Sequence, residues 1–251
     1  MIFTIAGREM RSLFLSPLAW SVLAVVQFIL AYMFLSQIEV FLSVQARLVS
    51  VPGAPGLTEI VVVPLLANAA IVLLLVVPLL TMRLISEERR SQTLSLLFSA
   101  PVSMTEIVVG KYCGVMGFLL IMLGMIALMP LSLQSGGNLD FSLCAAGLLG
   151  LLLLLGSFAA AGLYVSTLTV QPVVAAVATF GLLLLLWILD WSGSAADSRL
   201  SGLFPYLSVL RHYESLLKGV FDTSDVVYYL LFIGLFLILS IRRLDADRLQ
   251  H

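Results

Sequence analysis

Six long apolar runs occupy about half of this 251-residue chain. A helix needs roughly 20 apolar residues to cross the hydrocarbon core of a bilayer. Only 11% of the residues are charged, whereas a soluble domain carries about 25%, so the chain cannot form an aqueous surface. The sequence therefore predicts an all-α integral membrane protein with six transmembrane helices, built as one domain over residues 1–251. We expect these helices at approximately 18–36, 60–82, 108–131, 141–168, 173–190 and 224–241.

The positions of lysine and arginine predict the orientation of the bundle. If the N-terminus is cytoplasmic, nine of the 13 basic residues fall on the cytoplasmic side, which is the usual bias in membrane proteins. An even number of spans then places both termini in the cytoplasm. We expect no cleaved signal peptide, because charges interrupt the first segment and no small-residue cleavage site follows. The nine residues are Arg8, Arg11, Arg83, Arg89, Arg90, Lys111, Arg242, Arg243 and Arg248.

Residues 2–14 have the pattern of an amphipathic helix that lies on the inner leaflet. Arg8, Glu9 and Arg11 fall on its polar face. Ser16 and Pro17 end the helix before the first span. The helix is either a simple anchor or a lever beside a cytosolic partner, and the sequence favours neither. Its apolar face consists of Phe3, Ala6, Met10, Leu13 and Phe14.

The cytoplasmic segment between the second and third spans, residues 83–111, is longer than a connection requires. Ser86 is placed to cap a helix, and Glu87 and Glu88 fall in its first turn, where the helix dipole favours anions. Ser103 then begins the third span with capping-box spacing. We expect a short helix across the membrane surface that serves as a docking element, and a solvated charged loop is the alternative. Its apolar face and its end are formed by Leu94, Leu97, Phe98 and Pro101.

Residues 200–225, on the outer side, also have an amphipathic pattern. Gly219 is placed to cap the end of this helix. The helix is expected either to dip into the outer leaflet or to pack across the ends of the spans. His212 is expected to be a polar surface residue. The apolar stripe is made of Leu203, Tyr206, Leu207, Leu210, Tyr213 and Leu217.

The polar content of the spans disfavours several functional classes. Ionisable residues are nearly absent from them, which argues against an ion-coupled transporter, and no charged ring or polar filter indicates a channel. Gln27 and Asn68 lie mid-span and are expected to form hydrogen bonds between helices. Lys111 lies near a span end, where a long side chain can reach the interface. An intramembrane enzyme is disfavoured because no HExxH motif, intramembrane histidine or buried aspartate pair occurs.

Three stretches resemble the permease subunit of type-2 ABC exporters, with the gliding-motility-associated (GldF-like) permeases as the closest branch. These are REMRSLFLSPLAW at 8–20, RLISEERRSQTLSLLFSAPVSMTEIVVGKY at 83–112 and YLSVLRHYESLLKGVFDTSDVVYY at 206–229. The resemblance covers nearly the whole chain. Gln92 departs from it, because family members often have Gly there, and we expect Gln to stiffen the helix slightly. In the outer stretch the matching positions are His212, Glu214, Gly219 and Asp225.

The resemblance implies a bacterial inner-membrane, multi-pass protein that works with two ABC ATPase subunits and a second permease copy, identical or related. It allows an auxiliary membrane protein with an outer domain as a further partner. The chain itself would bind no cofactor or metal and have no catalytic residue, with ATP and Mg²⁺ held by the ATPase; indeed no GxxxxGK[ST] motif occurs. Nothing indicates nucleic acid, and the lipid bilayer is the other partner.

Under this resemblance, closure of the ATPase subunits pushes the coupling helix at 86–103 and moves spans two and three. Arg8, Glu9 and Arg11 would lie beside the docked ATPase. The result is either export of an amphipathic cargo or mechanical signalling across the membrane, and a scaffold without transport is the alternative. The expected docking residues are Glu87, Glu88, Arg89, Arg90, Thr93, Leu94, Leu97, Phe98 and Pro101.

Overall fold

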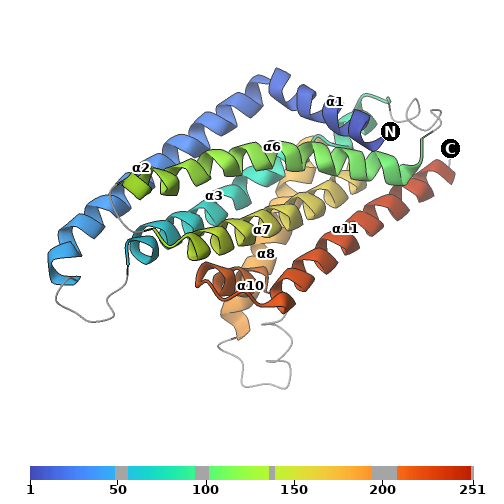
Figure 1. Cartoon of the computed structure of the whole chain (residues 1–251). Helices are drawn as coiled ribbons and strands as arrows, with labels where there is room; N and C mark the ends of the chain where they lie inside the picture. The colour runs from blue at the N-terminus through green and yellow to red at the C-terminus, as the bar shows by residue number, and fades with distance from the viewer. Residues whose placement is uncertain (49–55, 94–101, 136–138, 194–207, 250–251) are drawn as a thin grey trace.

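A computed structural model describes residues 1–48, 56–93, 102–135, 139–193 and 208–249. Every regular element in these ranges is a helix, as the sequence predicts, and the long helices run side by side as an elongated bundle (Figure 1). The elements are α1 Ile2–Leu15, α2 Pro17–Leu48, η1 Thr58–Val62, α3 Val63–Thr81, α4 Ser86–Arg90, α6 Met104–Ser132, η2 Leu133–Ser135, α7 Phe141–Leu168, α8 Pro172–Gly193, α10 Val209–Leu217 and α11 Thr223–Leu249.

Five helical segments in the described ranges are long and apolar enough to cross a membrane. The predicted span at 173–190 falls on α8, whose apolar part, Pro172–Ile188, is shorter than this criterion requires. The count of six spans therefore stays a prediction. The first span was predicted to end at residue 36, but α2 continues to Leu48. The five segments are Pro17–Gln45, Thr58–Arg90, Met104–Ser132, Phe141–Leu168 and Thr223–Arg248.

Helix α7 lies at the centre of the bundle and contacts α3, α6, α8, α10 and α11. Small residues allow this close packing, as they do between membrane helices generally. A Cβ atom added at Gly162 would lie only 2.2 Å from Thr81 Oγ1 on α3. The Tyr112 hydroxyl on α6 donates to the Gly156 carbonyl at 3.2 Å. On another pair of helices, Gln27 Nε2 of α2 donates to the Met122 carbonyl of α6 at 3.4 Å, which confirms the hydrogen bond predicted for Gln27.

Helix α1 packs along the first half of α6, and both helices run in the same direction. Gly110, Gly114 and Gly117 of α6 form the contact surface. A Cβ atom at Gly110 would lie 2.8 Å from Ile5 Cβ, and one at Gly114 would lie 2.6 Å from Glu9 Cβ. The predicted amphipathic helix is therefore present, but one side of it is covered by protein. Of the predicted apolar face, Ala6 is buried by protein, whereas Phe3 is 91% exposed.

Helix α4 is shorter than the sequence predicts. It ends at Arg90, and Ser91 and Gln92 form a turn in which Gln92 has φ +57°. This is the left-handed region, where glycine is least strained, so Gln92 ends the helix rather than stiffening it. The predicted single helix through 86–103 is thus interrupted after one turn. The predicted residues Leu94, Leu97, Phe98 and Pro101 lie outside the described residues.

Candidate functional site

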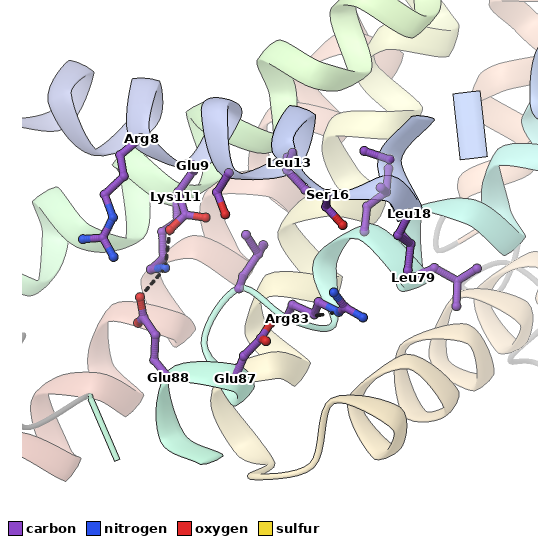
Figure 2. Close-up of a pocket in the computed structure, with 14 residues that line it drawn as sticks. Arg8, Glu9, Leu13, Ser16, Leu18, Leu79, Arg83, Glu87, Glu88 and Lys111 are labelled. Carbon is purple, nitrogen blue, oxygen red and sulfur yellow. Dashed lines mark hydrogen bonds and ion pairs between the residues drawn. The ribbon is translucent and has the colours of Figure 1, made fainter. Parts of the chain in front are cut away.

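A buried lysine joins three helices at one end of the bundle (Figure 2). Lys111 of α6 is 3% exposed, and its Nζ atom lies 2.6 Å from Glu9 Oε1 on α1 and 2.8 Å from Glu88 Oε1 on α4. The three residues come from sequence positions up to 102 apart. Ionised donors and acceptors at these distances form strong hydrogen bonds, and each carboxylate needs the lysine because it is itself largely buried.

A hydroxyl of α7 holds the beginning of α4. The backbone amides of Ile85 and Ser86 both donate to Ser166 Oγ at 3.1 Å, and that hydroxyl donates to the Met82 carbonyl at 3.1 Å. Ser86 was predicted to cap the helix. It is instead the first helical residue, and its own hydroxyl donates to the Met82 carbonyl. Ser166, which lies 80 positions from Ser86 in the sequence, therefore caps the beginning of α4 in place of a neighbouring residue.

A second ion pair joins α4 to the C-terminal helix. Arg89 pairs with Asp247 of α11, and Arg243 lies 3.6 Å from the same carboxylate. Both Arg89 and Asp247 are largely buried. The five residues of α4 are consequently fixed to α1 and α6 through Lys111, to α7 through Ser166, and to α11 through Asp247.

These contacts divide the predicted docking residues into two groups. Glu88 and Arg89 point into the chain and form internal ion pairs, so they are not free to contact a partner in this arrangement. Glu87, Arg90 and Thr93 are exposed. On α1, Arg8 and Arg11 are exposed, whereas Glu9 is tied to Lys111. Capping-box bonds between Ser103 and Glu106 begin α6, as predicted.

A cavity of about 310 Å³ opens between α1 and the α3–α4 corner, beside Lys111. Figure 2 shows Arg8, Glu9 and Leu13 on the α1 side, with Arg83, Glu87 and Glu88 opposite. One part of its wall is charged and the other is apolar. The lining residues are Arg8, Glu9, Ser12, Leu13, Ser16, Leu18, Ala19, Leu79, Leu80, Arg83, Leu84, Glu87, Glu88 and Lys111.

A comparison with protein-family models matches residues 3–249 to the ABC-2 family transporter protein. The chain belongs to the ABC-2 family. The family match confirms the predicted resemblance at the level of ABC-2 permeases, and the GldF-like branch stays a prediction. Comparison with curated protein sequences gave no match. This ABC-2 protein is therefore a multi-pass membrane component of an ABC transporter, and its family implies an ABC ATPase subunit as its partner.

The opposite end of the ABC-2 protein carries a second polar cluster, between α10 and α11. His212 Nδ1 lies 2.6 Å from Asp225 Oδ1, and the His212 ring stacks on Tyr228 with centroids 4.1 Å apart. The prediction that His212 is merely a polar surface residue is therefore wrong. The Tyr229 hydroxyl donates to the Val209 carbonyl at 2.8 Å, which ties α11 to the start of α10. Close by, the Ser224 amide donates to Asp222 and lowers the pKa of that carboxyl.

Helix α10 packs against α7, in agreement with the prediction that it packs across the ends of the spans. Cβ atoms added at Gly150 and Gly147 of α7 would lie 2.9 Å from Leu216 Cβ and 3.7 Å from Leu217 Cδ2. Gly219 ends the helix with φ +75°, and its amide donates to the Leu216 carbonyl, so the predicted cap is confirmed. Glu214 is exposed and lies 4.0 Å from Lys218.

The Ser166→Ala variant tests whether α7 holds α4. Removal of the hydroxyl leaves two buried amides without their acceptor, and the loss of a helix cap costs about 1 kcal/mol. We expect a lower melting temperature of the purified ABC-2 protein and faster hydrogen exchange at Ile85 and Ser86. Ser157→Ala is the matched control, because the Ser157 hydroxyl bonds only the Leu153 carbonyl of its own helix among the described contacts. Equal effects of both changes would contradict the assignment.

Proposed function

We propose that this chain is the permease subunit of an ABC exporter and that a separate ATPase subunit docks at the end of the bundle that carries α4. The observation that supports this proposal is the fixation of α4. Its backbone and its two inward charges are bound to α1, α6, α7 and α11, whereas Arg90 and Glu87, which also lines the cavity, are exposed. A partner that contacts the exposed residues would therefore act on four helices at once.

The exposed charges of α4 are suited to a protein partner. Glu87 and Arg90 present opposite signs on one short helix, and Thr93 follows them on the exposed turn. Ion pairs at an interface fix register and partner choice more than they add affinity. The apolar residues expected next along the chain, Leu94 and Leu97, would then supply the anchors that carry most of the binding energy.

The remaining features of the proposal follow the resemblance to the GldF-like permeases. Two permease copies, each with six spans and both termini in the cytoplasm, would sit in a bacterial inner membrane with two ATPase subunits that bind ATP and Mg²⁺. The transported cargo would be amphipathic, because the spans present apolar surfaces. Mechanical signalling to an outer partner would use the same docking site.

Co-purification from gently solubilised native membranes tests the proposal. We expect a P-loop ATPase to copurify with the tagged native chain. We expect Leu94→Asp and Leu97→Asp each to remove it, since the loss of an interface anchor of about 2 kcal/mol weakens binding about thirtyfold. The charge exchange Glu87→Lys with Arg90→Glu should weaken it less, and Arg242→Glu on α11 is the matched control that should retain the ATPase.

If the Leu94→Asp and Leu97→Asp variants fold and still copurify with the ATPase, the ATPase does not dock at this segment. Absence of any ATPase from the native preparation in several detergents would contradict the exporter proposal and favour a membrane scaffold. Where binding is retained, stimulation of ATP hydrolysis by the permease separates coupling from simple attachment.

A further inference from the structure

The cavity beside Lys111 has two chemically different walls. Ionisable side chains of α1, α4 and α6, with Arg83 of the turn before α4, form one wall. Leu18 and Ala19 at the start of α2, with Leu79 and Leu80 near the end of α3, form the other. A ligand that fills both parts must be amphipathic, because a wholly polar ligand would leave the leucines exposed and a wholly apolar one would leave the charges unsolvated.

The residues around the cavity are of the types found where a membrane changes from polar to apolar. Trp20 directly follows the lining residue Ala19, is exposed, and donates its indole N–H to the Phe14 carbonyl at 2.8 Å. Exposed tryptophans at the end of a span mark the head-group level of the bilayer. Arg83 follows the apolar end of α3 on the other side of the cavity, at the polar end of its span.

The charges of the lining select a zwitterionic head group. The wall contains three cations and three carboxylates. Lys111 is already bound by Glu9 and Glu88, and Arg83 and Glu87 lie together on one side of it, with Arg8 on the other (Figure 2). Arg83 and Glu87 lie 4.0 Å apart and are 48% and 59% exposed, so they form only a loose ion pair. Loose pairs of this kind contribute little to stability and can be exchanged for ligand contacts at small cost.

We propose that this cavity binds a phospholipid with a phosphate and a primary ammonium in its head group, as in phosphatidylethanolamine. Arg83 contacts the phosphate, Glu87 accepts from the ammonium, and the acyl chains start along Leu18 and Leu79. A choline head group fits less well, because its quaternary nitrogen has no N–H donor and is recognised by aromatic rings. No aromatic side chain is among the described residues that line the cavity.

Native mass spectrometry of the full-length protein in detergent tests this inference. The probes are phosphatidylethanolamine, phosphatidylcholine and phosphatidylglycerol with the same acyl chains, and inorganic phosphate as a competitor. We expect phosphatidylethanolamine to reach half occupancy at about tenfold lower concentration than the other two lipids, which corresponds to about 1.4 kcal/mol. Phosphate at millimolar concentration should not displace it.

Three variants locate the site. Arg83→Ala should weaken the binding of phosphatidylethanolamine at least tenfold, since a charge-assisted bond to phosphate is lost. Glu87→Gln should reduce the preference over phosphatidylcholine and should not weaken the binding of phosphatidylglycerol. Arg242→Ala, which removes a cation from the exposed part of α11 rather than from the lining, is the matched control and should bind as the native chain does.

Several results would overturn the proposal. Equal or tighter binding of phosphatidylglycerol by the native chain would indicate attraction of acidic lipids to basic surface residues. Displacement by phosphate would indicate a phosphate site without a lipid. Unchanged binding in the Arg83→Ala variant would place the lipid elsewhere. The measurement needs no ATPase subunit, so its failure is distinguishable from failure of the proposed docking.

Discussion

Replacement of Lys111 with methionine is expected to destabilise the protein more than any other single change discussed here. The lysine lies between the Glu9 and Glu88 carboxylates and is almost inaccessible to solvent. Removal of one partner from a buried ion pair costs about 3–5 kcal/mol, because the remaining charges lose their compensation. We expect a clearly lower melting temperature in detergent and loss of ATPase binding, since α4 would no longer be fixed to α1 and α6.

A charge-neutral triple variant separates electrostatics from packing. Lys111→Met combined with Glu9→Gln and Glu88→Gln leaves no uncompensated charge in the cluster. Neutral or apolar replacements of whole buried ion pairs are often as stable as the original, so we expect the triple variant to recover most of the lost melting temperature. If Lys111→Met alone melted at the native temperature, the cluster would not stabilise the fold.

Replacement of Gly114 with leucine is expected to displace α1 from α6. The added Cβ atom would lie 2.6 Å from Glu9 Cβ and 3.0 Å from the Ala6 carbonyl oxygen, so backbone as well as side chain would have to move. Overpacking of this kind costs about 1–3 kcal/mol, and movement of Glu9 would also break its ion pair with Lys111. We expect faster tryptic cleavage at Arg8 and Arg11 and a lower melting temperature.

The matched control is Gly124→Leu on the same helix. A Cβ atom at Gly124 meets nothing within 4 Å, and the change in helix propensity from glycine to leucine is the same at both positions. The control should therefore be as stable as the native chain or more so. Equal cleavage rates of α1 in the two variants would show that the glycines of α6 do not position α1.

The sequence predicted most helices well because apolar runs and caps are local signals. Ser103 with Glu106 and the turn at Gly219 were legible from a few residues each, and both are present. Local signals also caused the errors. The apolar run that defined the first span stops near residue 36, but backbone hydrogen bonds continue α2 through more polar residues to Leu48. The length of α4 was overestimated because Gln92 adopts a left-handed backbone conformation. Glycine at this position would have indicated such a turn, but glutamine does not.

The candidate site depends on contacts between distant residues, which no local pattern encodes. Lys111 was interpreted as a lysine at a span end, yet it meets carboxylates 102 and 23 positions away. One signal was available: Gly110 and Gly114 on the same helix indicate that another helix approaches closely, which removes the room a lysine needs to reach water. His212 and Asp225 are only 13 residues apart, but the turn between α10 and α11 must be known before their contact is evident.

Helix α7 contacts α4 near one of its ends and α10 near the other. Ser166 accepts a hydrogen bond from the Ser86 amide of α4, and Gly147 and Gly150 pack against α10. A helix of 28 residues is about 42 Å long and resists compression along its hydrogen-bonded axis. The contacts to α4 and to α10 therefore belong to one continuous helix, and we expect an axial shift imposed beside α4 to be transmitted to α10.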